Sequence, residues 1–158
     1  MVWDQEAPSS NLGTPTSANG ASRGAWDKMS TEDAKRHIEV AERQLTRVQT
    51  ASWDPDDEDR EDAVTWGFYA YENAVVAVAE KVNMPWKKNH WDKREIASEI
   101  FTKGYVSVDV ADRLDELNEL RKDVQYGEAG PDLVDYDLED LASGLENFIE
   151  QARKFVDA

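Results

Sequence analysis

The chain has 158 residues, of which 34 are acidic and 18 basic, so its formal net charge at pH 7 is −16. That length suits one domain with one core, and the acidity argues against a general coat for nucleic acid or for an anionic membrane. Cysteine is absent and only two histidines occur. This excludes disulfides, thiolate zinc sites and thiol nucleophiles, and it disfavours a histidine-rich metal centre. We therefore expect no metal and no cofactor.

Residues 1–29 are rich in Ser, Thr, Gly, Pro and Asn and show no hydrophobic period. Such a composition predicts a flexible tail, which leaves residues 30–158 as the folded domain. The first residues lack the basic start and apolar centre of a secretory signal. No apolar run approaches the roughly twenty residues of a membrane span. We therefore expect a cytoplasmic protein that does not enter a membrane.

Two long helices are predicted in the first half of the domain. The first has a capping-box-like start at Ser30 and an apolar seam, spaced by three or four residues, to about Thr50. Asp54 and Pro55 suit the cap and first position of the second helix, which is predicted over residues 57–83. The acids around this start favour a helix N-terminus over a cation site, because the glycine and distal glutamate of a calcium loop are missing.

Three more helices are predicted in the second half. They are a short helix over residues 91–102 that buries Ile96, Ile100 and Phe101 and stops at Gly104, a long helix capped by Ser107 and ended by Gly127, and a last helix over residues 137–156. No useful alternating segment suggests a strand. The sequence therefore predicts an all-α fold, an antiparallel bundle of four long helices plus one short helix.

The second helix is predicted to be the central one. Its middle, Trp66 to Val82, is apolar almost all round, which is typical of a helix covered on several sides. Glu72 and Asn73 are the strongly polar residues in this stretch, and buried polar groups need partners. These two residues are therefore candidates for a polar site.

Arg121 occupies the position between Leu117 and Val124 on the apolar seam of the fourth helix. A guanidinium there must reach solvent, pair with a carboxylate such as Glu72, or face a functional cleft. The spacing leaves these alternatives open.

The segment Leu117 to Gly127, with the sequence LNELRKDVQYG, resembles the signature of the HEPN superfamily. These are small all-helical bundles whose motif is an Arg followed, after a short spacer, by a His near the end of a late helix. The segment Trp66 to Ala74 resembles their long central helix, which often carries a polar residue facing the motif. The resemblance extends over residues 31–157 in helix order and lengths more than in identity.

The resemblance implies a role for each matching residue. Arg121 corresponds to the family's Arg, and Tyr126 stands at the place of the His, with Asp123 between them. Glu72 or Asn73 corresponds to the supporting polar position. Family members are often metal-independent endoribonucleases that act as dimers, and many are toxins partnered with a small nucleotidyltransferase antitoxin or serve phage defence. The resemblance thus implies a homodimer, an RNA or nucleotide ligand and a nucleotidyltransferase-type partner.

Tyr126 is a departure from the family pattern. Metal-free RNA cleavage needs one group to accept the 2′-hydroxyl proton and another to protonate the leaving oxygen, and His does both near neutrality. Tyr, with a reference pKa of about 10, is a poor base at pH 7. We therefore predict a HEPN-like module that binds RNA or a nucleotide, with weak or lost endoribonuclease activity.

The linker over residues 81–94 is basic and aromatic, with five Lys or Arg residues and one acid. Its candidates for phosphate contacts and base stacking are Lys87, Lys88, Arg94, Trp86 and Trp91. His90 could supply the missing imidazole if the linker folds back to Arg121. The competing interpretation is that the tryptophans cover the end of the bundle while the lysines balance the acidic surface.

Three functions remain open. The first is an endoribonuclease that uses Arg121 and Tyr126, and the second is a HEPN-like binding module without nuclease activity. The third is an acidic helical module for protein–protein interaction without nucleic-acid chemistry, which the net charge favours. The position of Arg121 discriminates among them, since a cleft supports the first two and a solvated outer face supports the third.

Overall fold

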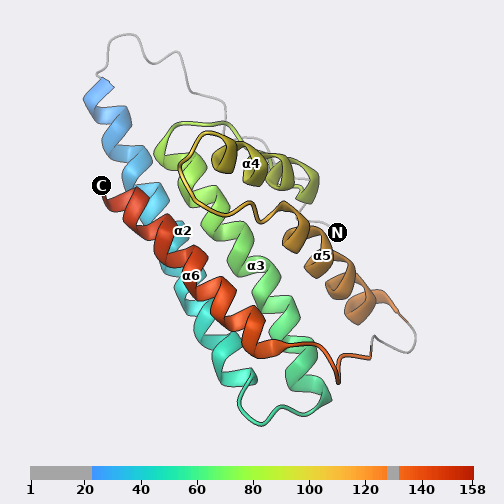
Figure 1. Ribbon diagram of the computed structural model, residues 1–158. Coiled ribbons are helices and arrows are strands. Elements are labelled where there is room, and N and C mark those ends of the chain that lie inside the picture. Colours follow the sequence, from blue (N-terminus) through green and yellow to red (C-terminus); the bar gives the residue numbers. More distant parts are fainter. Residues whose placement is uncertain (1–22, 128–131) are drawn as a thin grey trace.

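The computed structural model describes residues 23–127 and 132–158, with side chains from Ser30 onward (Figure 1). These two stretches contain no strand and five helices, which are α2 (Arg23–Ala51), α3 (Asp57–Lys81), α4 (His90–Thr102), α5 (Ala111–Tyr126) and α6 (Leu138–Asp157). The predicted all-α bundle of four long helices and one short helix is confirmed.

The central helix is α3, as predicted. It contacts each of the other four helices, whereas α2 and α5 flank it without packing extensively on each other in the described part of the chain (Figure 1). Its side chains are buried on nearly every side because its middle is apolar all round. The apolar seam of α6 closes the core from another direction, and Leu141, Leu145 and Phe148 are fully buried.

The first helix begins earlier than predicted. It starts at Arg23, so residues 23–29 are helical and the predicted start at Ser30 is wrong. Ser30 lies inside α2, and its hydroxyl donates to the side-chain oxygen of Asn83 rather than capping its own helix. The rest of the predicted tail, residues 1–22, lies outside the described residues.

The acid-rich start of α3 is confirmed, but its cap is Asp56 rather than Asp54. The Asp56 carboxylate accepts the backbone N–H of Asp59 at 2.7 Å, and the Asp59 carboxylate accepts the Asp56 N–H at 3.1 Å. Asp54 instead adopts a left-handed backbone with φ 51° in the preceding turn. The reciprocal pair of bonds favours the later cap.

The α4 prediction is largely confirmed. Asn89 caps the helix, and Ile96 and Ile100 are buried. Phe101 is 42% exposed, so its predicted burial is wrong. Phe101 follows the buried Ile100, and adjacent residues of a helix lie about 100° apart around the axis, so Phe101 points away from the core.

The predicted Ser107 cap of α5 is also wrong. The helix begins at Ala111 after Val110, which makes no side-chain cap, and Asp109 Oδ1 accepts the Ala111 N–H at 2.9 Å instead. Ser107 is drawn toward α6 instead, because its backbone N–H and hydroxyl both donate to Gln151 Oε1, at 2.9 and 3.0 Å. Gly127 follows the end of α5 as predicted, and Asp137 caps α6.

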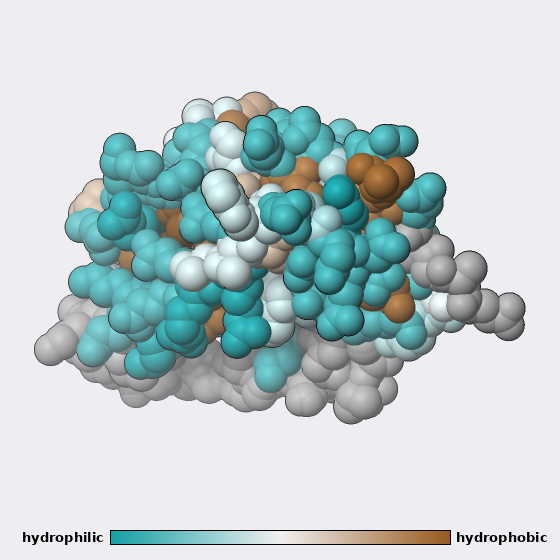
Figure 2. Space-filling view, turned by 90° about the horizontal axis from the view of Figure 1, so that it is seen from below, coloured by the Kyte–Doolittle hydropathy of each residue, from teal (hydrophilic) through white to brown (hydrophobic). Residues whose placement is uncertain are grey.

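The described helices all fall short of the combined length and apolar character needed to cross a membrane. Seen from below, the molecule presents a mostly hydrophilic surface on which hydrophobic side chains form separate patches (Figure 2). A mostly polar surface on this face is consistent with the large share of charged residues in the sequence.

Candidate functional site around Arg121

One row of side chains on α3 is partly exposed to solvent. Between Gly67 and Ala79 only Tyr69 and Asn73 are not buried, and Trp66 continues their line. The spacing of three and four residues places the three side chains on one helix face. We call Trp66, Tyr69 and Asn73 the α3 stripe.

Polar side chains of α2 border one edge of the α3 stripe. The guanidinium carbon of Arg47 lies 4.4 Å from the centre of the Trp66 ring. The Asn73 amide donates to Gln44 Oε1 at 3.1 Å, and its oxygen lies 3.1 Å from His37 Nδ1. Asn73 therefore ties α3 to α2 and does not face the motif on α5.

Arg121 of α5 lies beside the α3 stripe and is only 5% exposed. Its guanidinium carbon stands 4.8 Å from the Phe68 ring centre and 5.8 Å from that of Tyr69. Its Nη2 donates to Asn118 Oδ1 at 2.7 Å, and its Nη1 donates to Gln125 Oε1 at 3.0 Å. Both hydrogen-bond partners are neutral amides of the same helix.

The charge of Arg121 has no carboxylate partner within ion-pair distance among the described residues. Its Nε is buried and also lacks a hydrogen-bond partner there. A guanidinium stays protonated, and buried charges are ordinarily paired. The aromatic ring faces offset part of this cost. The surroundings of Arg121 therefore favour an additional anion.

Glu72 makes its contacts elsewhere. It is 3% exposed, and its Oε1 accepts a hydrogen bond from Lys93 Nζ at 3.2 Å. Its Oε2 lies 3.6 Å from His90 Nδ1. Of the alternatives left open for Arg121, pairing with Glu72 is not the one found, because α4 supplies the counter-ions of this carboxylate.

The other motif residues lie at the exposed end of α5. Tyr126 is the last helical residue and is 64% exposed, and Asp123 is also exposed. The structure thus separates the predicted residues, with Arg121 buried, Tyr126 and Asp123 at the surface, and Glu72 and Asn73 in contacts with other helices.

His90 contacts the same aromatic ring as Arg121. The His90 ring centre lies 5.6 Å from that of Phe68, the same ring that Arg121 contacts. His90 Nε2 is 3.0 Å from Asp115 Oδ1, so the imidazole sits between two carboxylates. Burial lowers the pKa of His90, but Glu72 and Asp115 outweigh it and raise that pKa. This favours the protonated ring, which cannot act as a base.

The predicted RNA-binding residues of the linker divide into two groups. Trp86 is half-buried and donates to Glu80 Oε1 at 2.7 Å, and Arg94 donates to Asp115 Oδ2 at 2.6 Å. Lys87, Lys88 and Trp91 are exposed. Trp86 thus packs against the core and Arg94 forms an ion pair with α5, whereas the second group stays accessible.

Sequence reasoning missed several residues of this site. Asn118 and Gln125 lie three and four residues from Arg121, a spacing that places them on its helix face. The same spacing relates Trp66, Tyr69 and Asn73. Arg47 gave no signal in the sequence, because its contact depends on how α2 packs against α3.

Two pockets, of about 320 and 260 Å³, lie around Arg113, and neither is lined by Arg121 or His90. In the described part of the chain, no group of three or more His, Asp or Glu side chains is placed to hold a metal ion. No family model matches the chain, and comparisons with curated proteins and with solved structures find no match.

Proposed function

We propose that this chain is a HEPN-like helical module that binds a phosphate-containing ligand, RNA or a nucleotide, beside Arg121. The observation that carries the proposal is the buried guanidinium without a carboxylate partner among the described residues. A phosphate oxygen would supply the missing negative charge and form charge-assisted hydrogen bonds. The burial of Arg121 also argues against the solvated outer face expected of a purely acidic docking module.

The α3 stripe suits the rest of such a ligand. Trp66 and Tyr69 are half-buried rings next to two guanidinium groups, those of Arg47 and Arg121. Aromatic rings interleaved with cations are typical of surfaces that stack bases and contact phosphates in single-stranded RNA. These charges are few against a net charge of −16, so we expect modest affinity that falls with added salt.

We propose that endoribonuclease activity is weak or lost. Tyr126 replaces the family's His, and His90, the nearest alternative, is held between Glu72 and Asp115. A base for the 2′-hydroxyl must be unprotonated and within reach of the substrate. His90 meets the first condition poorly because both carboxylates stabilise its cation.

We also propose that the module is a homodimer. Leu120 and Val124 of α5 are half-buried near Arg121 and add apolar area to the α3 stripe, which a two-fold partner could cover. Light scattering should give twice the chain mass of 17.9 kDa. A monomer mass at high micromolar concentration would contradict this. The family resemblance also makes a nucleotidyltransferase-type antitoxin a candidate partner, testable by co-purification.

The binding test compares two substitutions on α5. Fluorescence anisotropy with a labelled single-stranded RNA at low salt should show that Arg121→Ala weakens binding by about 1.5–3 kcal/mol, the scale of a charged hydrogen bond. Lys122→Ala removes the same charge from the exposed neighbouring position and should change binding much less. Equal losses would show that Arg121 forms no site.

The cleavage test restores the family pattern. In EDTA, Tyr126→His should raise RNA cleavage above the wild-type level, and combining it with Arg121→Ala should abolish the gain. If Tyr126→His brings no gain, the binding module stands ahead of the enzyme. If the wild type binds no RNA at all, the acidic protein-interaction module, which the net charge of −16 favours, takes the place of both.

A further inference from the structure

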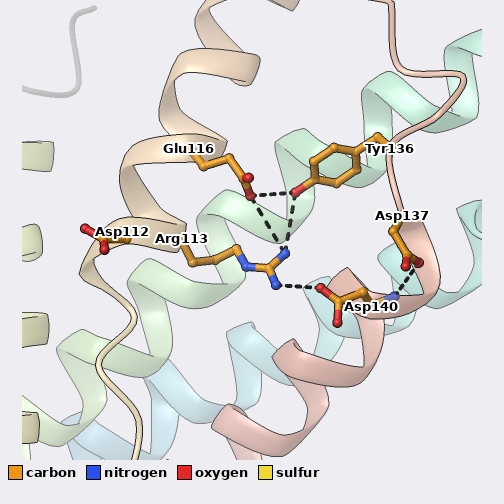
Figure 3. Close-up of a pocket in the computed structure, with 6 residues that line it drawn as sticks. All are labelled: Asp112, Arg113, Glu116, Tyr136, Asp137 and Asp140. Carbon is orange, nitrogen blue, oxygen red and sulfur yellow. Dashed lines mark hydrogen bonds and ion pairs between the residues drawn. The ribbon is translucent and has the colours of Figure 1, made fainter.

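Arg113 of α5 separates two pockets near the start of α6. In the larger one, shown in Figure 3, Arg113 Nη2 donates to Asp140 at 2.8 Å and Nη1 lies 3.5 Å from the Tyr136 hydroxyl. That hydroxyl donates to Glu116 at 3.0 Å. Asp140, Tyr136 and Glu116 thus hold the guanidinium in place, whereas Asp112 forms no hydrogen bond or ion pair with them (Figure 3).

The smaller pocket, of about 260 Å³, lies beside Tyr71 of α3. Tyr71 is 2% exposed, and its ring packs against Phe148 at 5.7 Å between centres. Tyr71 lines the pocket, and no hydrogen bond to its hydroxyl is formed among the described residues. The side chain is buried, but its oxygen is not one of the enclosed polar atoms that lack a partner. The hydroxyl can therefore be reached from the pocket and can donate to a ligand there.

Gly144 of α6 leaves that hydroxyl open to the pocket. A Cβ at this position would lie 3.0 Å from the Tyr71 oxygen and 4.0 Å from Arg113 Nη2. Glycine in a helix interior costs about 1 kcal/mol relative to alanine. The missing side chain thus exposes two donors, a hydroxyl and a guanidinium, on one side of the pocket.

The pocket walls define the kind of ligand that fits. Val108, Val110 and Phe148 are apolar, whereas Asp109 presents a carboxylate. Burial raises the pKa of Tyr71 to about 12, although the nearby Arg113 acts to lower it. The hydroxyl therefore stays protonated, and able to donate, at neutral pH. Asp109 disfavours an anion. Its carboxylate already accepts the Ala111 N–H at 2.9 Å and the Ser98 hydroxyl at 3.3 Å, and each oxygen has a second lone pair for a further N–H. The volume lies just below the range of about 300–1,000 Å³ that is usual for drug-sized ligands.

We propose that the Tyr71 pocket binds a small neutral molecule that has an apolar ring and a carbonyl or amide oxygen, which accepts hydrogen bonds from Tyr71 and Arg113 over Gly144. An amide nitrogen on the same molecule would face Asp109. This site does not involve Arg121, so its failure would leave the proposed RNA-binding function untouched.

The test is a titration of the full chain with benzamide, followed by ¹H–¹⁵N NMR. We expect saturable shifts centred on Tyr71, Val110 and Gly144, with weaker binding of benzoate because of its charge. Tyr71→Phe should weaken benzamide binding about two- to tenfold, the equivalent of one neutral hydrogen bond of 0.5–1.5 kcal/mol. Absence of saturable shifts in the wild type, or shifts centred elsewhere, would overturn the proposal.

Gly144→Ala provides the sharper comparison. The added methyl group should abolish benzamide binding while the fold is kept, because alanine favours the helix. Ser143→Ala, at the exposed neighbouring position on α6, should bind benzamide as the wild type does. Should Gly144→Ala fail to fold, Tyr71→Phe decides. Wild-type affinity in both variants would refute the site.

Discussion

Two clusters of charged and polar side chains that both contact the Phe68 ring differ in how they pair positive charge. In the Glu72 cluster (Glu72, His90, Lys93, Arg94, Asp115), each cation meets a carboxylate. In the Arg121 cluster (Phe68, Tyr69, Asn118, Arg121, Gln125), the guanidinium meets two amides and two ring faces. Every cation of the first cluster thus has a carboxylate partner, whereas the guanidinium of the second has none among the described residues and can accept an external anion.

The difference separates a structural role from a binding role. The Glu72 cluster joins α3, α4 and α5, and it anchors the short helix α4 through Lys93 and His90. The Arg121 cluster is built mostly within α5 and contacts α3 only through aromatic rings. Loss of the first should therefore damage the fold, and loss of the second should mainly affect a ligand.

The largest effect is expected for Glu72→Gln. Removing this carboxylate takes the partner of the buried Lys93 and one of the two carboxylates beside His90, and breaking a buried ion pair costs about 3–5 kcal/mol. Urea unfolding should show this loss in the free energy of unfolding. Glu146→Gln removes the same charge from an exposed position on α6 and should stay within about 0.5 kcal/mol.

A smaller loss is expected for Arg121→Met. This change removes two hydrogen bonds to amides and two contacts with ring faces, but it breaks no ion pair among the described residues. We expect a loss of about 1–2 kcal/mol in the free energy of unfolding. A loss as large as that of Glu72→Gln would make Arg121 a structural residue and remove the contrast between the clusters.

The helices were largely predictable because their signals are local. Apolar seams spaced by three or four residues, Gly104, Gly127 and the acids before α3 all act within one turn of chain. Two of the errors arose where a polar side chain found a distant partner. Ser30 bonds Asn83 and Ser107 bonds Gln151 across the bundle, so neither caps the helix expected from its neighbours.

The candidate site was predictable only in part for the same reason. Burial of Arg121 on the seam of α5 follows from its spacing, and the need of Glu72 for a partner follows from the apolar residues around it. Which cation reaches Glu72 depends on how α4 packs against α3, and no local pattern encodes that packing. The sequence therefore marked both residues as candidates but left open whether they pair, and the packing of α4 assigns them to separate clusters.

The smallest effect, and the one most specific to the Glu72 cluster, is a dependence of stability on pH. His90 faces Glu72 from α3 and Asp115 from α5, with Lys93 and Arg94 on its own helix. Burial lowers the pKa of His90, but the two carboxylates raise it above its ordinary value of about 6.5. The stabilisation from protonated His90 is then complete below about pH 6.5 and is lost as the pH rises through the folded pKa.

Asp115 acts at the opposite end of the pH range. Burial alone would raise its pKa, but Arg94 and His90 have the larger opposite effect, so the pKa is lowered overall. The stabilisation from ionised Asp115 is therefore complete above its ordinary pKa of about 3.9, and it is lost as the pH falls through the lowered pKa. Between about pH 6 and 9 Asp115 stays ionised, so of these two groups only His90 should make the stability depend on pH. The wild-type free energy of unfolding should therefore fall over this range, His90→Gln should flatten the decline, and His37→Gln should keep it. If the wild type and His90→Gln gave parallel curves, the imidazole would not be a cation of this cluster, and Lys93 alone would neutralise Glu72.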